Sequence, residues 1–140
     1  MGNLPERIAV ELENIDKVLS QLSKGINSPR LSDLELAGVA ALVHNFYNGI
    51  ENILKQAVRL RKHKVPQGPN WHRDLLVLAV SSKIVSRKTC EALKPYLAFR
   101  HFFSHSYAFD LDQERIFPLV RDIQKIYAQF RRDLEKFKKN

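Results

Sequence analysis

The segment from Arg100 to Tyr107 holds the residues of this sequence that are best suited to chemistry. It reads Arg-His-Phe-Phe-Ser-His-Ser-Tyr, so that His105 follows Arg100 after four residues and Tyr107 comes two positions later. A histidine, with an unperturbed pKa of about 6.5, can accept or donate a proton near neutral pH. An arginine guanidinium can hold a phosphate through paired charged hydrogen bonds. The segment therefore predicts proton transfer beside a bound phosphate, with His101 as a further candidate contact.

His101 and His105 also have the spacing at which two histidines of one helix can bind a metal ion. No third ligand is evident, because Phe102 stands where such motifs place a glutamate, and we therefore predict no metal site. Each residue also has a simpler interpretation when it is taken alone. Arg100 could neutralise a helix C-terminus, His101 and His105 could be solvated, and Tyr107 could pack at the helix end.

Positive charge is concentrated in the middle of the chain. Residues 55–100 contain eleven Lys and Arg against two Asp and Glu, a net charge of +9, whereas the whole chain carries +8. A field of this kind favours a polyanion such as RNA as a partner. The alternative is that the basic residues near 59–64 only complement the dipole of the helix that they end.

Apolar residues that recur three and four positions apart predict the helices that position this segment. A first helix follows the apolar stripe from Ile8 to Leu22. A second begins at Ser32, which is expected to form a capping box with Glu35, and reaches about Lys64. Two prolines and a glycine within residues 65–70 then predict the main loop.

Three more helices are expected after this loop. The first covers residues 71–82, the second runs from Ser86 or Thr89 to about Ser104 with a kink or restart at Pro95, and the last runs from about 111 or 116 to 137. Phe102, Phe103 and Phe109 are expected in the core. The predicted fold class is all-α, an antiparallel four-helix bundle with an additional short helix, and residues 1–140 form one domain.

Several function classes lack their signature in this sequence. There is no glycine-rich phosphate loop, no pair of zinc-binding cysteines and no Gly-x-Ser-x-Gly elbow. Cys90 is the single cysteine, and no apolar run approaches the roughly 20 residues that a membrane span needs. We therefore expect a cytoplasmic protein without membrane attachment.

The pattern Arg-x4-His-x-Tyr, near the end of the penultimate long helix of a small basic bundle, resembles the HEPN superfamily and specifically HepT-type toxins. The resemblance implies a metal-independent endoribonuclease that needs no cofactor and acts on cellular RNA, with tRNA as the expected substrate. Arg100 and His105 correspond to the catalytic pair, and His101 fits the polar position after the arginine. The family's site forms where two protomers meet, which implies a homodimer in which one histidine acts as base and the other as acid.

The same resemblance assigns a regulatory role to Tyr107. In HepT-type toxins this tyrosine is where an MNT-type nucleotidyltransferase antitoxin attaches adenylate, so Tyr107 is the expected AMPylation site. Within the same superfamily, the alternative is a non-catalytic helical binding partner of a minimal nucleotidyltransferase, and a generic helical adaptor is the third hypothesis. The intact pair of Arg100 and His105 favours the ribonuclease.

Overall fold

Five α-helices and one short 3-10 helix make up the protein in a computed structural model that describes residues 4–25 and 30–139. The elements are α1 (Leu4–Gly25), α2 (Asp33–Leu60), α3 (Trp71–Ser81), α4 (Arg87–His105), η1 (Ala108–Asp110) and α5 (Gln113–Lys138). The described ranges contain no strand, which confirms the all-helical prediction. None of their helices combines the length and the apolar character that crossing a bilayer requires.

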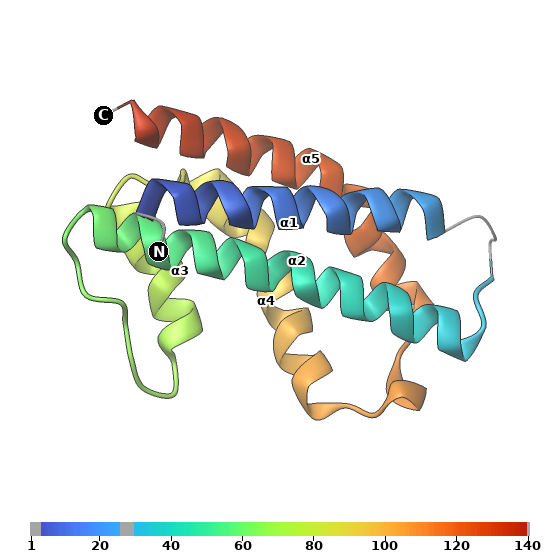
Figure 1. Cartoon of the computed structure of the whole chain (residues 1–140). Coiled ribbons are helices and arrows are strands. Elements are labelled where there is room, and N and C mark those ends of the chain that lie inside the picture. The colour runs from blue at the N-terminus through green and yellow to red at the C-terminus, as the bar shows by residue number, and fades with distance from the viewer. Residues whose placement is uncertain (1–3, 26–29, 140) are drawn as a thin grey trace.

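The four long helices form the predicted bundle, and α3 is its additional short helix (Figure 1). α1 and α2 are an antiparallel pair, and α5 lies along α1 in the opposite direction. α4 contacts both α2 and α5, while α3 packs on α2 and α4. The loop after α2 and the C-terminal end of α4 project from the side of the bundle opposite α5 (Figure 1).

The second helix begins as predicted and ends earlier than predicted. Ser32 Oγ accepts a hydrogen bond from the Glu35 backbone N–H at 3.1 Å, and Glu35 Oε1 accepts one from the Ser32 backbone N–H at 2.8 Å, which is the expected capping box. The helix stops at Leu60 rather than near Lys64, because Lys62 adopts a left-handed conformation with φ 62°. The basic residues after Leu60 therefore lie in the loop that leads to α3.

The bounds and the burial of two other helices add detail to the expectation. α5 begins at Gln113, between the two starts considered for it, and Pro118 lies inside the helix. In α3, Leu78 and Val80 are only half-buried, whereas Ala79 is fully buried beside Leu75 and Leu76. The apolar stripe of α1 is buried along its whole length, as predicted.

A close approach of α1 and α2 holds the middle of α2 in place. Gly49 is buried, and a Cβ atom added to it would lie 2.6 Å from Cγ1 of Ile15. Ile15 is itself buried in the core, with only 1% of its surface exposed. The glycine therefore lets the two helices pack closely at the position where α2 carries Asn48 and Glu51.

Substituting Gly49 by alanine is expected to destabilise the fold. The added methyl group overpacks the contact with Ile15, which costs about 1–3 kcal/mol and exceeds the gain in helix propensity. Gly38 is the matched control, since it is exposed in the same helix and a Cβ there meets nothing within 4 Å. Thermal unfolding should show a lower Tm for Gly49→Ala and an equal or higher Tm for Gly38→Ala. Equal Tm changes for the two variants would contradict this account of the contact.

Polar contacts with α5 fix the start and the middle of α4. Ser86 caps the helix, and Asp133 Oδ2 accepts hydrogen bonds from the Ser86 backbone N–H at 2.9 Å and from Thr89 Oγ1 at 2.5 Å. Tyr96 Oη donates to the Leu119 carbonyl at 2.6 Å. The helix continues through Pro95 to His105, so the restart considered at this proline does not occur. These contacts hold the segment around residue 100 against the bundle.

Candidate functional site

A groove of about 650 Å³ lies between the start of α3 and the C-terminal half of α4. Three residues singled out from the sequence, Arg100, His101 and His105, line it together. Tyr107 is not among the residues that line it. The other lining residues are Pro69, Asn70, His72, Arg73, Lys94, Leu97, Ala98 and Ser104. The basic groove therefore brings a guanidinium and three imidazoles within reach of one ligand.

Arg100 is held by two side chains of α2. Its Nε donates to Asn48 Oδ1 at 3.2 Å and forms an ion pair with Glu51, whose Oε1 lies 3.1 Å from the same nitrogen. Neither Nη atom has a hydrogen-bond partner among the residues that the structure describes. The guanidinium is thus fixed through Nε, and its two outer nitrogens remain available for a ligand such as a phosphate.

Glu51 connects three helices. Its side chain is only 3% exposed, and Oε2 lies 2.5 Å from Nδ1 of His72 on α3, while Oε1 faces Arg100 on α4. A buried carboxylate is unfavourable unless it is paired and hydrogen-bonded. Glu51 meets this requirement through both of its oxygens, and the pairing fixes His72 and Arg100 relative to each other.

Sequence reasoning missed Asn48, Glu51 and His72 as parts of this site. Their signal was a polar stripe on α2, because His44, Asn48 and Glu51 follow one another at spacings of four and three and so share one helix face. A stripe of this kind is indistinguishable from a solvated face until its neighbours are known. His72 stands beside the loop, where it could stack on a base or pack against the bundle, and nothing near it in the sequence indicates its pairing with Glu51.

His44 lies beside Asn48, on the same face of α2, and packs against Phe103 of α4. Its ring contacts Phe103, with centroids 4.8 Å apart, and its Nδ1 lies 3.4 Å from the amide nitrogen of Asn48. Burial, and secondarily the positive charge of Arg100, lower the pKa of His44 below its usual value. A neutral His44 can accept a hydrogen bond from the Asn48 amide nitrogen, which directs the amide oxygen toward Arg100.

The lowered pKa of His44 predicts a loss of stability in mild acid. Below the unfolded pKa of about 6.5, the unfolded chain binds a proton that the folded chain does not, so stability falls as the pH falls. We expect His44→Gln to show a smaller decrease in Tm than the wild type between about pH 7.5 and pH 5.5. The exposed His63 supplies the control, since His63→Gln should keep the wild-type decrease. The same decrease in all three proteins would exclude His44 as the cause.

His101 and His105 are exposed neighbours on consecutive turns of α4. Their ring centroids are 4.9 Å apart and the rings meet edge to face at 63°. Within residues 4–25 and 30–139, no three metal-ligating side chains gather into a group that could hold an ion. His105 ends the helix, and its position places an imidazole at the rim of the groove.

Tyr107 and Phe109 form an exposed aromatic pair just beyond α4. Their rings are stacked at 4° with centroids 5.3 Å apart, and the side chains are 71% and 78% exposed. The expectation that Phe109 belongs to the core is therefore wrong, because η1, where Asp110 Oδ2 accepts a hydrogen bond from the Tyr107 backbone N–H at 3.0 Å, leaves the Phe109 ring on the surface. Phe102 and Phe103 are half-buried against the core.

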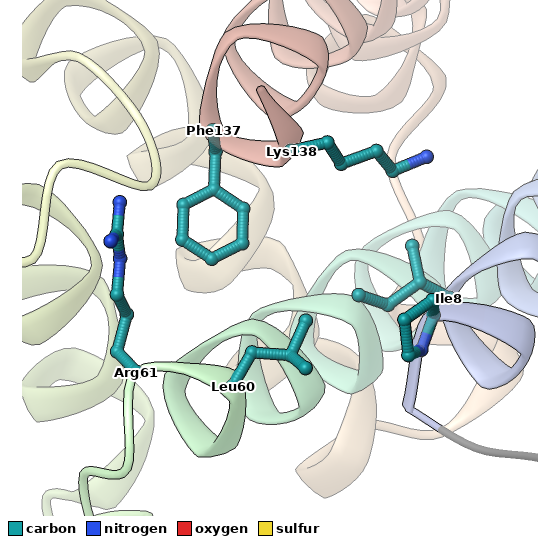
Figure 2. A pocket seen from close by; sticks show the side chains of 6 residues that line it. Ile8, Leu60, Arg61, Phe137 and Lys138 are labelled. Atoms are coloured by element: carbon teal, nitrogen blue, oxygen red, sulfur yellow. The ribbon is translucent and has the colours of Figure 1, made fainter. Parts of the chain in front are cut away.

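A second hollow, of about 400 Å³, has a different character. It lies where the N-terminal end of α1 meets the C-terminal ends of α2 and α5 (Figure 2). Arg61 lies over the ring of Phe137, 4.6 Å from its centroid. The described residues that complete it are Pro5, Ile8, Leu60 and Lys138. None of these lining residues is a histidine or a carboxylate, so the groove beside α4 is the better candidate for acid and base chemistry.

Comparisons with known proteins give one family for this chain. A family model described as HepT-like protein matches residues 38–140. The matched range includes all residues of the groove together with Asn48 and Glu51. Searches among curated proteins and among solved structures gave no significant match.

Proposed function

Since this chain belongs to the family of HepT-like proteins, we propose that it is a HEPN-type toxin that cleaves cellular RNA as a metal-independent endoribonuclease. The observation that carries the proposal is the geometry of Arg100. Its Nε is fixed by Glu51 and Asn48, and Arg100 lines the same groove as His105. This combination of a phosphate-binding group and a titratable imidazole is what phosphodiester cleavage without a metal requires.

The chemistry follows from these side chains. Arg100 binds the scissile phosphate and stabilises the negative charge that grows on its oxygens as the 2′-hydroxyl attacks phosphorus. His105 transfers a proton in this step, and His101 on the preceding turn supplies a further contact to RNA. Arg73 and Lys94, which also line the groove, attract the phosphates on either side.

A homodimer is part of the proposal. The Arg-x4-His pattern supplies one arginine and one histidine per chain, and in HepT-type toxins, which the sequence resembles, the site forms where two protomers meet. A two-fold axis beside residues 100–107 would use the same surface twice. It would bring two copies of Arg100 and His105 together, so that one histidine acts as base and the other as acid.

The partner in this proposal is an MNT-type nucleotidyltransferase antitoxin that attaches AMP from ATP to Tyr107. Exposure of this side chain beside the groove supports the assignment. The phosphate of a bound adenylate would lie near His105 and compete with RNA phosphate for Arg100. The modification would therefore silence cleavage and leave the fold intact.

An RNA cleavage assay tests the proposed function. The purified protein is expected to cleave tRNA at the same rate with and without EDTA, and to leave 2′,3′-cyclic phosphate and 5′-hydroxyl ends, because the 2′-hydroxyl is the nucleophile. Loss of activity in EDTA would contradict the metal-independent mechanism and favour metal binding by His101 and His105. An absence of cleavage of any cellular RNA would contradict the enzyme and favour the non-catalytic partner of a nucleotidyltransferase.

A further inference from the structure

We propose that an apolar groove between α3 and the first half of α4 is a docking site for a partner protein, which binds through an amphipathic helix with acidic residues beside its apolar stripe. The groove has a volume of about 770 Å³. It is called the docking groove below, to separate it from the candidate site beside the C-terminal half of α4. Docking does not depend on RNA cleavage and so goes beyond the proposed function.

Two helix faces form the docking groove. Its lining residues recur three or four positions apart from Arg73 to Ser81 on α3 and from Arg87 to Leu97 on α4. At 1.5 Å per residue these stretches extend about 12 Å and about 15 Å, which matches the span of helix anchors at i, i+4 and i+7. Among the described elements α3 contacts only α2 and α4, so this short helix lies at the edge of the bundle (Figure 1).

The floor of the docking groove is aliphatic. Leu76 and Cys90 are buried in it, and Val80 and Leu97 are half-buried. Val77 is 62% exposed, so a partner that covers it removes apolar surface from water. No aromatic side chain of the described residues lines the groove, and an RNA base therefore has no ring on which to stack. This floor favours the apolar side chains of a protein helix.

The rim of the docking groove is basic, which selects the charge of the partner. Arg73, Arg87 and Lys94 supply three positive charges, and Glu91 supplies one negative charge that is paired with Lys94 at 2.7 Å. Arg73 and Arg87 are exposed and have no ion-pair partner in the part of the chain that the structure describes. Acidic residues beside an apolar stripe complement this rim. A second copy of the chain would place like charges opposite each other in a two-fold contact.

The docking groove is continuous with the candidate site. Arg73, Lys94 and Leu97 line both of them. A helix seated in the docking groove would pair its carboxylates with Arg73 and Lys94, to which the proposed function assigns the phosphates on either side of the cleaved bond. Docking should therefore weaken RNA binding. This consequence rests on the proposed function, whereas docking itself does not.

A library of displayed helical peptides tests the chemistry of the partner. Each peptide carries leucines in one helical stripe, and glutamate, lysine, glutamine and serine are equally frequent at its other positions. Selection on the wild type with counter-selection on Val77→Asp should enrich glutamate beside the stripe. The variant should keep the wild-type Tm, because the Val77 side chain is exposed. Enrichment of lysine, or no enrichment, would overturn the proposal.

Fluorescence anisotropy with a selected peptide then maps its binding site. Val77→Asp and Arg87→Glu should each raise the Kd by about tenfold or more, since they place a negative charge against the apolar stripe and the glutamates of the peptide. Val10→Asp and Lys17→Glu are matched controls, because both side chains are exposed on α1, and they should keep the wild-type Kd. An unchanged Kd in the first pair, or an equal loss in all four variants, would contradict docking in this groove.

Two further measurements examine the other possible occupants. Loss of single-stranded RNA binding in Val77→Asp, as large as the loss of peptide binding, would assign the docking groove to RNA. A dimer in analytical ultracentrifugation that Val77→Asp converts into a monomer would assign it to a second copy. Either result would overturn the proposal. A peptide that binds and displaces labelled RNA would support it, and peptide binding to a wild type that cleaves no RNA would overturn the proposed function alone.

Discussion

Replacing His105 by alanine is expected to slow RNA cleavage by about 10²–10⁴-fold, the usual effect of losing a proton-transfer group. The reason is chemical rather than structural, because His105 is exposed at the end of α4 and, among the residues that the structure describes, its ring contacts only His101. The rate should be measured under single-turnover conditions with saturating protein, so that weaker binding does not mimic slower chemistry. A Tm equal to that of the wild type would show that the fold is intact.

The same experiment extends to Arg100, with one structural complication. Arg100→Ala removes a partner of the buried Glu51 and is expected to destabilise the fold by about 3–5 kcal/mol. Arg100→Lys retains the charge but cannot offer two outer nitrogens while a third is held by Asn48, so it should also lose cleavage.

Controls of the same residue types separate catalysis from general charge effects. His63→Ala removes an exposed histidine of the loop, and Arg121→Ala removes an exposed arginine of α5 that pairs with the adjacent Asp122. Both should cleave at the wild-type rate. Activity near the wild-type level in His105→Ala would remove His105 from the mechanism, and activity in Arg100→Lys would show that one positive charge is sufficient.

Local patterns in the sequence predicted the helices well. The spacing of apolar residues indicates a helix whatever its neighbours are, and the pair of Ser32 and Glu35 marks the start of α2 through contacts made within four residues. The end of α2 was less predictable. Apolar periodicity continues to Leu60, but the left-handed turn at Lys62 that stops the helix leaves no comparable signal in a lysine.

The candidate site was only partly predictable because it is assembled from distant parts of the chain. Arg100 and His105 belong to one local pattern, whereas Arg100 meets a residue 52 positions earlier and His72 meets one 21 positions earlier. These contacts depend on how closely α2 packs against α1 and α4, which periodicity does not specify. Phe109 was wrongly expected in the core, since an aromatic side chain is usually buried, whereas the short helix η1 leaves this ring exposed.

Incubation with an MNT-type nucleotidyltransferase, ATP and magnesium is expected to add adenylate to Tyr107 and to abolish cleavage. Tyr107 is the exposed member of the four tyrosines, since Tyr47, Tyr96 and Tyr127 are buried in the core. Its phenol is therefore the accessible tyrosine nucleophile, and the transfer joins its oxygen to the α-phosphate of ATP and releases pyrophosphate. The attached phosphate brings negative charge and bulk to within two residues of His105, where RNA phosphate has to bind.

Mass spectrometry of the intact chain and of its peptides measures this modification, and Tyr107→Phe is the matched control. The phenylalanine retains the ring that stacks on Phe109, so this variant should fold and cleave RNA like the wild type but remain active after incubation with the transferase and ATP. Thermal unfolding should give the same Tm for modified and unmodified wild type, because the ring is exposed and its hydroxyl has no partner among the described residues. An adenylate on another residue, an equal addition to Tyr107→Phe, or full cleavage by the modified chain would each show that an antitoxin of this kind controls the groove by a different route.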